Sequence, residues 1–284
     1  MSGETPAATI LPSRVADAPV PQAAAGGQWS QFVGLYAREL IRTFRNKFVL
    51  LVTVVQPFMW LAFFGSSFSG VPLPVLDTLL RTHLSSYLQF LLPGVLSTSM
   101  LSIGMFGSMS TIQDKRFGFM KRILLTPTSK ATVYLTKALG SATRGLVQVP
   151  VMIAAALLFG VRLNGDPLEW AGWILGLVFL GLGFSCLFLA VTASSTDWQT
   201  PGVISNFITM PLMFASGALF PQQNFPSWMQ AIANVNPVTY SALFGRGILV
   251  DGTADWLYLG YLAVFAAVML GIGTWVASRY LKVE

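Results

Sequence analysis

The sequence predicts an all-α integral membrane protein with six transmembrane helices in one domain. Of its 284 residues, 54% are hydrophobic and only 10% are charged, and the mean hydropathy is +0.65. A transmembrane helix needs about 20 consecutive, mainly apolar residues. Six stretches meet this requirement, at 49–68, 88–110, 133–160, 170–194, 201–220 and 256–278.

The first 28 residues differ from the rest of the chain. They are rich in Ala and Pro, with scattered charges and no apolar run. A secretory signal peptide needs an apolar core of about 7–15 residues, so we expect residues 1–28 to be a disordered cytoplasmic tail. The membrane domain then comprises residues 29–284.

Residues 29–47 predict an amphipathic helix before the first span. Apolar residues recur every three or four positions, and Arg38, Arg42 and Arg45 lie between them. Such a helix suits the membrane interface. The alternative is a plain cytoplasmic extension of the first membrane helix. The apolar positions are Trp29, Phe32, Val33, Tyr36, Leu40 and Phe44.

Basic residues are distributed unevenly between the two sides of the predicted helices. Lys and Arg are concentrated before the first span, between spans two and three, and after the last span. Cytoplasmic loops are enriched in Lys and Arg. We therefore expect a multi-pass protein of the cell membrane with both termini in the cytoplasm. Topology and anionic lipid explain the net charge of +6, and no nucleic-acid partner is expected.

Lys137 and Arg144, in the first half of span three, come nearest to placing charge inside the membrane. Lys137 can extend to the cytoplasmic face. For the deeper Arg144 two interpretations remain. It faces a protein-lined cavity or binds a carbonyl group, or else it contacts an anionic substrate. None of the eleven Asp and Glu lies in the middle of a span, which argues against a proton-coupled carrier.

Catalytic and metal sites are difficult to build from this sequence. His83 is the only histidine, and Cys186, the only cysteine, lies in an apolar run where it is expected to pack. The sequence contains no phosphate-binding loop of the Gly-x4-Gly-Lys-Ser/Thr type. We therefore expect no catalytic residue, metal or cofactor in this chain.

The segment between spans two and three has the densest charge. As a helix that Asp114 caps and Pro127 stops, it places Phe117, Met120 and Leu124 on one face, with cations on its flanks. An apolar ridge with a charged rim suits docking into a partner's groove. Simple association with the membrane surface is the alternative. The candidate residues are Asp114, Lys115, Arg116, Phe117, Gly118, Phe119, Met120, Lys121, Arg122, Leu124 and Pro127.

The segment between spans five and six combines the helix breakers Pro221 and Pro226 with Trp228 and Tyr240, which favour membrane interfaces. We interpret it as two short re-entrant helices that enter the membrane partway from outside. Backbone at that depth must be buried in protein or line a cavity. The alternative is an ordinary external loop with one amphipathic helix. The candidate gate residues are Pro221, Pro226, Trp228, Asn236, Pro237, Tyr240 and Arg246.

From Arg38 to the carboxy terminus, the chain resembles the type-2 permeases of ATP-binding-cassette (ABC) exporters, in particular the daunorubicin-resistance branch. The two segments just described carry the resemblance together with Gln56-Pro57, Trp60 and Phe64-Gly65 in span one. The chain departs from the branch at Lys121-Arg122, where an acidic residue is common, so the polarity of particular contacts in this segment differs.

The resemblance implies a permease homodimer above two copies of a separate cytoplasmic ATPase subunit, which binds ATP and Mg²⁺. It makes the basic segment the coupling helix and places the cargo path at the dimer interface, between spans two and five of each copy. The cargo is then a hydrophobic drug-like molecule or a lipid, with a lipid-linked polysaccharide as the alternative cargo. An ATP-independent carrier or assembly factor is the alternative class. The candidate path residues are Ser97, Met100, Ile103, Met105, Asn206, Thr209, Met210 and Met213.

Overall fold

A computed structural model describes residues 28–69, 87–117, 128–158, 161, 165–194 and 199–280, which are almost entirely helical and contain no strand. The longer helices are α1 (Gln28–Arg45), α2 (Lys47–Ser69), α4 (Tyr87–Arg116), α6 (Lys130–Leu146), α7 (Gln148–Leu158), α8 (Pro167–Ser194), α9 (Thr200–Phe214) and α12 (Trp256–Tyr280). Between α9 and α12 lie the 3-10 helix η1 (Gln222–Asn224), α10 (Ser227–Val235), α11 (Pro237–Arg246) and the π-helix η2 (Gly247–Asp251).

Four segments are long and apolar enough to cross a membrane, namely α4, α6 with α7, α8, and α12. There are five candidates if α1 and α2, which meet at 75°, count as one bent span. The described part of the chain is therefore an all-helical, multi-pass membrane protein with four or five candidate spans. The count of six stays a prediction.

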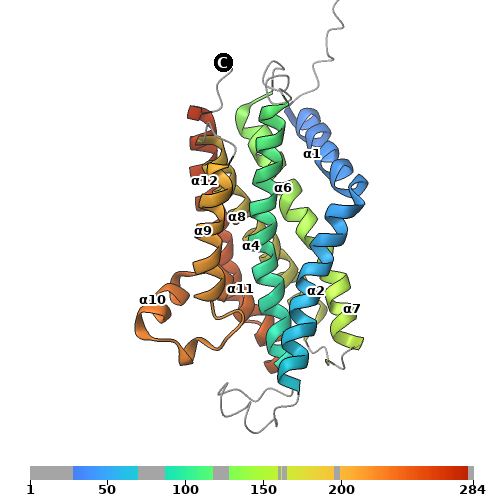
Figure 1. The fold of residues 1–284 in the computed structure, drawn as a ribbon, viewed down its shortest axis with the longest axis vertical. Coiled ribbons are helices and arrows are strands. Elements are labelled where there is room, and N and C mark those ends of the chain that lie inside the picture. Colours follow the sequence, from blue (N-terminus) through green and yellow to red (C-terminus); the bar gives the residue numbers. More distant parts are fainter. Residues whose placement is uncertain are drawn as a thin grey trace, which may run out of the picture.

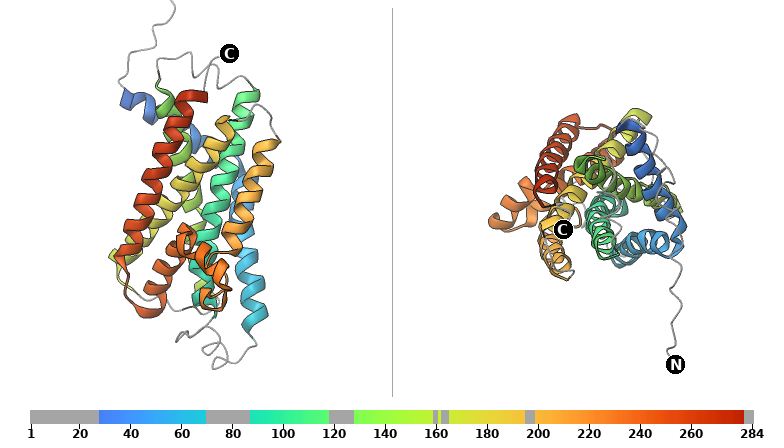
Figure 2. Two further views of the ribbon diagram at one scale, coloured as in Figure 1. Left: turned by 90° about the vertical axis from the view of Figure 1, so that its left-hand side faces the viewer. Right: turned by 90° about the horizontal axis from the view of Figure 1, so that it is seen from above.

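The helices form an elongated bundle in which α8 packs against α4, α6 and α12 (Figures 1 and 2). Large side chains such as Trp173, Phe184 and Phe244 are fully buried in its core. The Trp173 indole Nε1 donates a hydrogen bond to the carbonyl of Ser241, 3.2 Å away, so α11 is fixed to α8. Helices α2 and α9 flank α4 on either side (Figure 1).

The bend between α1 and α2 has a local cause at Asn46. Its side-chain Oδ1 accepts a hydrogen bond from the backbone N–H of Val49 at 3.1 Å, which caps the start of α2. Helix α1 then lies against α6, where a side chain at Gly140 would come within 2.9 Å of the Glu39 Cβ. Close approach of the two helices therefore depends on this glycine.

The predicted span 133–160 is built from two helices, α6 and α7, with a break at Val147. Pro150 explains the break, because it offers no N–H to the carbonyl of Leu146. Val147 keeps helical dihedral angles, with φ −61° and ψ −31°, so the helical phase continues from α6 into α7. Side chains four residues apart across the break, such as Arg144 and Gln148, share a face.

The helix predicted over 201–220 is wrong in its last six residues, because α9 ends at Phe214. Its 15 residues extend only about 22 Å, less than the hydrocarbon core of about 30 Å. The Asn236 side chain donates to the carbonyl of Leu212 at 2.7 Å. A side chain from α11 thus bonds a carbonyl of the last turn of α9.

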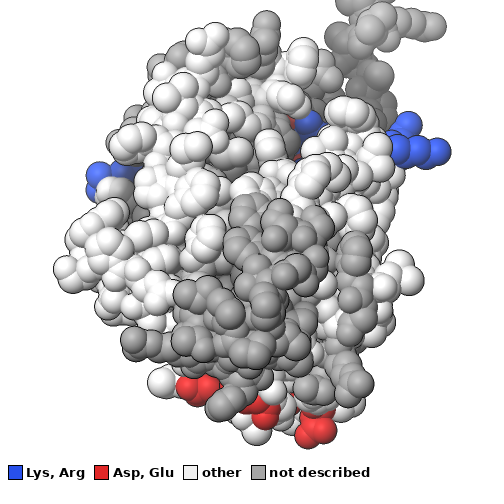
Figure 3. Space-filling model, turned by 60° about the horizontal axis from the view of Figure 1, so that its bottom comes forward, with Lys and Arg blue, Asp and Glu red and all other residues white. Residues whose placement is uncertain are grey.

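Charged side chains separate toward the two ends of the bundle. Arg42, Arg45 and Lys130 lie on the end that holds α1 and the beginning of α6, whereas Asp166 and Asp255 are exposed at the other end. Figure 3, which brings this second end forward, shows carboxylates gathered there. The two ends therefore present charge of opposite sign to the two membrane surfaces.

Candidate functional site

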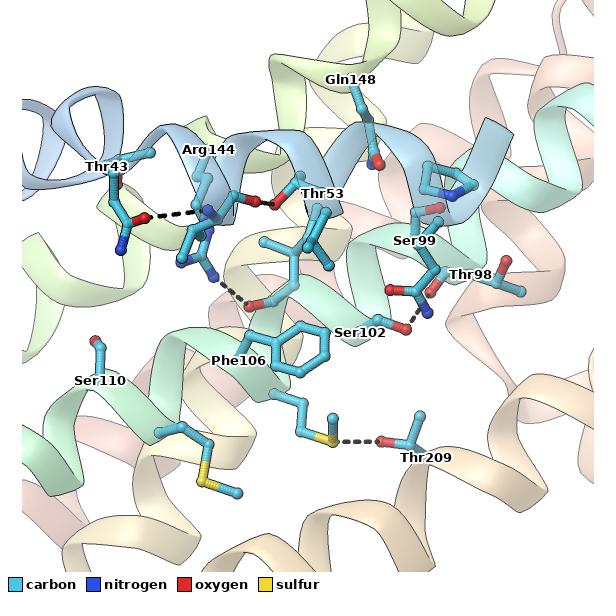
Figure 4. Close-up of a pocket in the computed structure, with 18 of the residues that line it drawn as sticks. Thr43, Thr53, Thr98, Ser99, Ser102, Phe106, Ser110, Arg144, Gln148 and Thr209 are labelled. Carbon is cyan, nitrogen blue, oxygen red and sulfur yellow. Dashed lines mark hydrogen bonds between the residues drawn. The ribbon is translucent and has the colours of Figure 1, made fainter. Parts of the chain in front are cut away.

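A cavity of about 610 Å³ lies between α2, α4 and α9, with α1 and the junction of α6 and α7 completing its walls (Figure 4). Drug-sized binding sites fall in the range of about 300–1,000 Å³. Much of its surface is apolar, from residues such as Val52, Phe106 and Met210, and the polar part includes several hydroxyl groups. These include Thr53 of α2 and Ser102 of α4. A cavity of this size and lining can accommodate an amphiphile.

The structure brings most of the predicted path residues to this cavity, namely Ile103, Met105, Asn206, Thr209, Met210 and Met213. Ser97 and Met100 do not line it, and their place on the cargo path stays a prediction. Ser97 is buried on another face of α4, where its hydroxyl donates to Ser241 Oγ at 2.8 Å, and Met100 is fully buried in the core. Successive helical residues turn by about 100°, so Ser102 and Phe106 occupy the cavity face instead.

Hydroxyl groups of α4 form a polar strip along the cavity. Ser99 donates to the carbonyl of Val95 at 2.6 Å, and Ser110 donates to that of Gly107 at 2.7 Å. Their protons are thus used within α4, while the hydroxyl oxygens still have lone pairs that can accept hydrogen bonds. Flexible, polarizable methionines add to the lining, with Met105 on α4 itself and Met210 on α9.

Arg144 and Gln148 reach the cavity from the α6–α7 side (Figure 4). Arg144 Nη2 donates to the carbonyl of Ile103 at 3.2 Å, so this residue both lines a protein cavity and binds a carbonyl, as the first of its two interpretations expected. Its Nε has no hydrogen-bond partner among the described residues, nor has either polar atom of the Gln148 amide. Contact with an anionic substrate stays a prediction.

A buried ion-pair cluster joins α1, α4 and α6 beside the cavity. Lys137 Nζ lies 2.5 Å from Asp114 Oδ2 and 3.5 Å from Glu39 Oε1. Arg42 Nη1 lies 2.9 Å from Asp114 Oδ1, and Arg38 Nη1 lies 3.4 Å from Glu39 Oε1. The side chains of Asp114 and Lys137 are only 7% and 5% exposed. Glu39 and Arg42 also line the cavity, so the cluster and the cavity share residues.

This cluster corrects one prediction made from the sequence. Asp114 does not cap a separate coupling helix, because it lies within α4, which continues to Arg116. Lys137 is neutralised by Asp114 and Glu39, and its extension to the cytoplasmic face stays a prediction. Both carboxylates come from segments distant in sequence, which short-range patterns cannot reveal.

The predicted coupling segment is described only at its start. Phe117 follows α4 directly and is 78% exposed. Of its other candidate residues, only the backbone of Lys115 and Arg116 is described, and Gly118 to Pro127 lie outside the described residues. The docking role of this segment stays a prediction.

Two short helices, α10 and α11, occupy the predicted external segment. Asn236 caps α11 by accepting from the Val238 N–H at 3.0 Å, and Pro237 is its first residue. Tyr240 packs against Tyr261 with ring centroids 4.1 Å apart. Trp228 is 65% exposed on α10. Pro221 precedes η1 and Pro226 precedes α10, so both prolines mark boundaries.

Arg246, predicted as part of an external gate, fixes three segments together. Its guanidinium donates to the carbonyls of Phe90, Gly217 and Ala218 at 3.0, 2.6 and 2.5 Å. It also lies 3.5 Å from the centroid of the Phe90 ring. A cation held by three carbonyls and an aromatic face holds the start of α4 and the turn after α9 against α11.

Comparison with known proteins agrees with this arrangement. The family model described as ABC-2 type transporter matches residues 30–250. A transport permease of Cyanophora paradoxa, ycf38, is 29% identical over 241 residues, which cover 84% of this chain and 80% of the relative. The daunorubicin resistance ABC transporter permease DrrB1 of Streptomyces coeruleorubidus is 26% identical, over 78% of this chain and 76% of its own.

The inner membrane transport permease YadH of Escherichia coli is 22% identical, over 75% of this chain and 80% of its own. Among the described residues, no group of three His, Cys, Asp or Glu could hold a metal ion. The matched segment runs from α1 through the cavity helices to η2, and therefore includes the ion-pair cluster, the cavity and the Arg246 contacts. This chain belongs to the ABC-2 type transporter family, whose members are the membrane-spanning permease components of ABC transporters.

Proposed function

We propose that this chain is the transmembrane subunit of an ABC exporter that moves a hydrophobic drug-like molecule or a lipid out of the cell. It works as a homodimer with two copies of a separate ATPase subunit, which binds ATP and Mg²⁺. The observation that carries the proposal is the cavity of about 610 Å³ between α2, α4 and α9 in a chain of this family.

The lining favours this cargo over a lipid-linked polysaccharide. Among the described lining residues, the aromatic side chains are Phe48, Trp60 and Phe106. A sugar chain is held by a continuous belt of aromatic faces, whereas Met105, Met210 and the neighbouring hydroxyl groups suit a single amphiphilic molecule.

The ion-pair cluster supports coupling between the ATPase and the cavity. The predicted coupling segment begins at Asp114 in the last turn of α4, and Asp114 is held by Lys137 and Arg42. Arg42 also lines the cavity. Displacement of the segment by the ATPase therefore acts on Asp114, which one ion pair joins to the cavity wall. ATP drives the cycle by binding the inward- and outward-facing states with different affinity.

The charge separation supports an orientation with both termini in the cytoplasm. The basic end of the bundle, with Arg45 and Lys130, then faces the cytoplasm, and the acidic end, with Asp166 and Asp255, faces outside. In this orientation α10 and α11 form short helices on the external side that enter the membrane partway.

The test is ATP-dependent uptake of daunorubicin and of a fluorescent phospholipid into inside-out vesicles. The vesicles contain this chain and an ATPase subunit encoded beside its gene. A matched control carries an ATPase subunit without its phosphate-loop lysine. The proposal predicts uptake of at least one cargo only with ATP and the intact ATPase. Equal uptake without ATP, or with the inactive subunit, contradicts it and favours an ATP-independent carrier.

A further inference from the structure

The wall formed by the junction of α6 and α7 presents hydrogen-bond donors that have no partner among the described residues. Gln148 is fully buried and lines the cavity, and in the described part of the chain neither its amide nitrogen nor its oxygen has a partner. One turn earlier, Arg144 uses Nη2 on the Ile103 carbonyl, and its buried Nε finds no partner in the same ranges. Buried polar groups are normally satisfied, so these two neighbouring side chains mark a place where a ligand completes the bonding.

Charge balance shows which ligand would fit. The carboxylates nearest to this wall, Glu39 and Asp114, are already paired with Lys137, Arg38 or Arg42. Arg144 has no carboxylate within 4.0 Å among the described residues. Together the cluster and Arg144 contain four cations and two carboxylates. The Arg144 guanidinium is partly buried and makes no ion pair of its own among the described residues, which is costly, and a negatively charged group in the cavity removes that cost.

The helix geometry places the two side chains together. Val147, at the break between α6 and α7, keeps helical angles, so Arg144 and Gln148 lie on one face. On the facing helix, a side chain at Gly107 would collide with Ser141 Oγ. The glycine therefore lets α4 pack closely against α6 beside Arg144.

We propose that Arg144 and Gln148 form a subsite for the anionic head group of an amphiphile, a phosphate or carboxylate, whose apolar chain lies along Met105, Met210 and Met213 of the same cavity. This inference rests on the proposed function, and it narrows the cargo to anionic lipid-like molecules. A cationic drug such as daunorubicin is then the poorer cargo. Arg144 supplies charge and a directed donor, while the Gln148 amide adds a donor for a second oxygen.

Binding can be measured on this chain alone, in nanodiscs of zwitterionic lipid. Trp60 lines the cavity, and brominated chains quench nearby indoles. Three probes share one dibromododecyl chain and carry a phosphate, an uncharged maltoside or a trimethylammonium head group. Binding at the cavity is measured as the part of the saturable quenching that disappears in the Trp60→Phe variant. We expect the phosphate to bind at least tenfold more tightly than the other two.

Variants identify the residues responsible. Arg144→Gln should weaken phosphate binding about ten- to a hundredfold, as loss of a charge-assisted hydrogen bond does, and Arg144→Lys should retain most of the preference. Gln148→Leu should weaken it up to about tenfold. Arg279→Gln is the matched control, because it removes one positive charge from the exposed end of α12 and should change nothing.

Equal affinity for the three head groups, or an unchanged preference in Arg144→Gln, overturns the subsite. If Arg144→Gln does not fold, the head-group comparison in the unaltered protein and in Gln148→Leu decides whether the subsite exists. Displacement of the bound probe by equimolar inorganic phosphate would show a site for a soluble anion and would also overturn the assignment to an amphiphile.

The binding experiment needs no ATPase subunit, so its result is independent of the test of export. A head-group preference without ATP-dependent uptake contradicts the proposed function but supports the subsite. ATP-dependent uptake without any head-group preference contradicts the subsite but supports the proposed export function.

Discussion

Replacing Asp114 with Asn tests the ion-pair cluster that joins α1, α4 and α6. The change keeps the shape of the side chain and removes the charge that lies 2.5 Å from Lys137 Nζ and 2.9 Å from Arg42 Nη1. Breaking a buried ion pair by removing one partner costs about 3–5 kcal/mol. In this variant Lys137 still has Glu39 Oε1 at 3.5 Å, and Arg42 is partly exposed. We therefore expect a loss at the lower end of this range, about 3 kcal/mol.

The assay is the midpoint of thermal unfolding of the purified chain. For a chain of this size, each kcal/mol shifts the midpoint by about 2–4 °C, so Asp114→Asn should lower it by about 6–12 °C. The double variant with Lys137→Met should recover more than half of the loss, because no buried charge is then left without a partner. Glu39 still pairs with Arg38 in that double variant.

Asp255→Asn is the matched control. Asp255 is exposed at the opposite end, where its side chain accepts from the Leu257 N–H at 3.0 Å. Asn caps a helix about as well as Asp, so the midpoint should stay within about 2 °C of the unaltered protein. A similarly small change in Asp114→Asn, or a double variant no more stable than the single one, would refute the reasoning about the cluster.

Two further predictions concern orientation and coupling. In a Cys186→Ala background, a cysteine at Asp166 should react with a membrane-impermeant maleimide in intact cells, and a cysteine at Lys130 should not; external labelling at Lys130 contradicts the orientation. Phe117→Asp should abolish co-purification of the ATPase subunit, because a carboxylate replaces an exposed apolar side chain expected to enter the groove, a loss of about 2 kcal/mol or more. Ser129→Asp is the control, because it adds the same charge at the same end and can still cap α6, and it should keep the ATPase subunit bound. Retained binding in Phe117→Asp would sink the docking assignment.

Local patterns in the sequence were sufficient to predict several elements. Two short helices were expected between spans five and six, and α10 and α11 lie there. The basic and apolar spacing of residues 29–47 corresponds to α1, which ends next to the capping residue Asn46. Each of these signals lies within a few residues of the structure it specifies.

Features that depend on distant partners could not be predicted in this way. Asp114 resembles a helix cap in sequence, but its partner Lys137 comes from another helix. Ser97 and Ser102 are equally plausible cavity residues until the rotation of α4 against its neighbours is known. The apolar run to residue 220 does not continue α9, because Asn236 and Arg246 bind carbonyls at its end and in the turn that follows.

The most direct test of the central claim, that cargo passes through the cavity between α2, α4 and α9, is the ATPase activity of the reconstituted complex carrying Asn206→Trp. Asn206 lines the cavity and lies away from Asp114 and Phe117, so the ATPase subunit should still bind. We predict unchanged basal hydrolysis and loss of most cargo-stimulated hydrolysis, because a filled cavity removes the differential affinity that couples cargo to the cycle. The control Val264→Trp, on an exposed face of α12, should alter neither. Equal loss of basal and stimulated activity in Asn206→Trp, or full stimulation despite the indole, would contradict the claim.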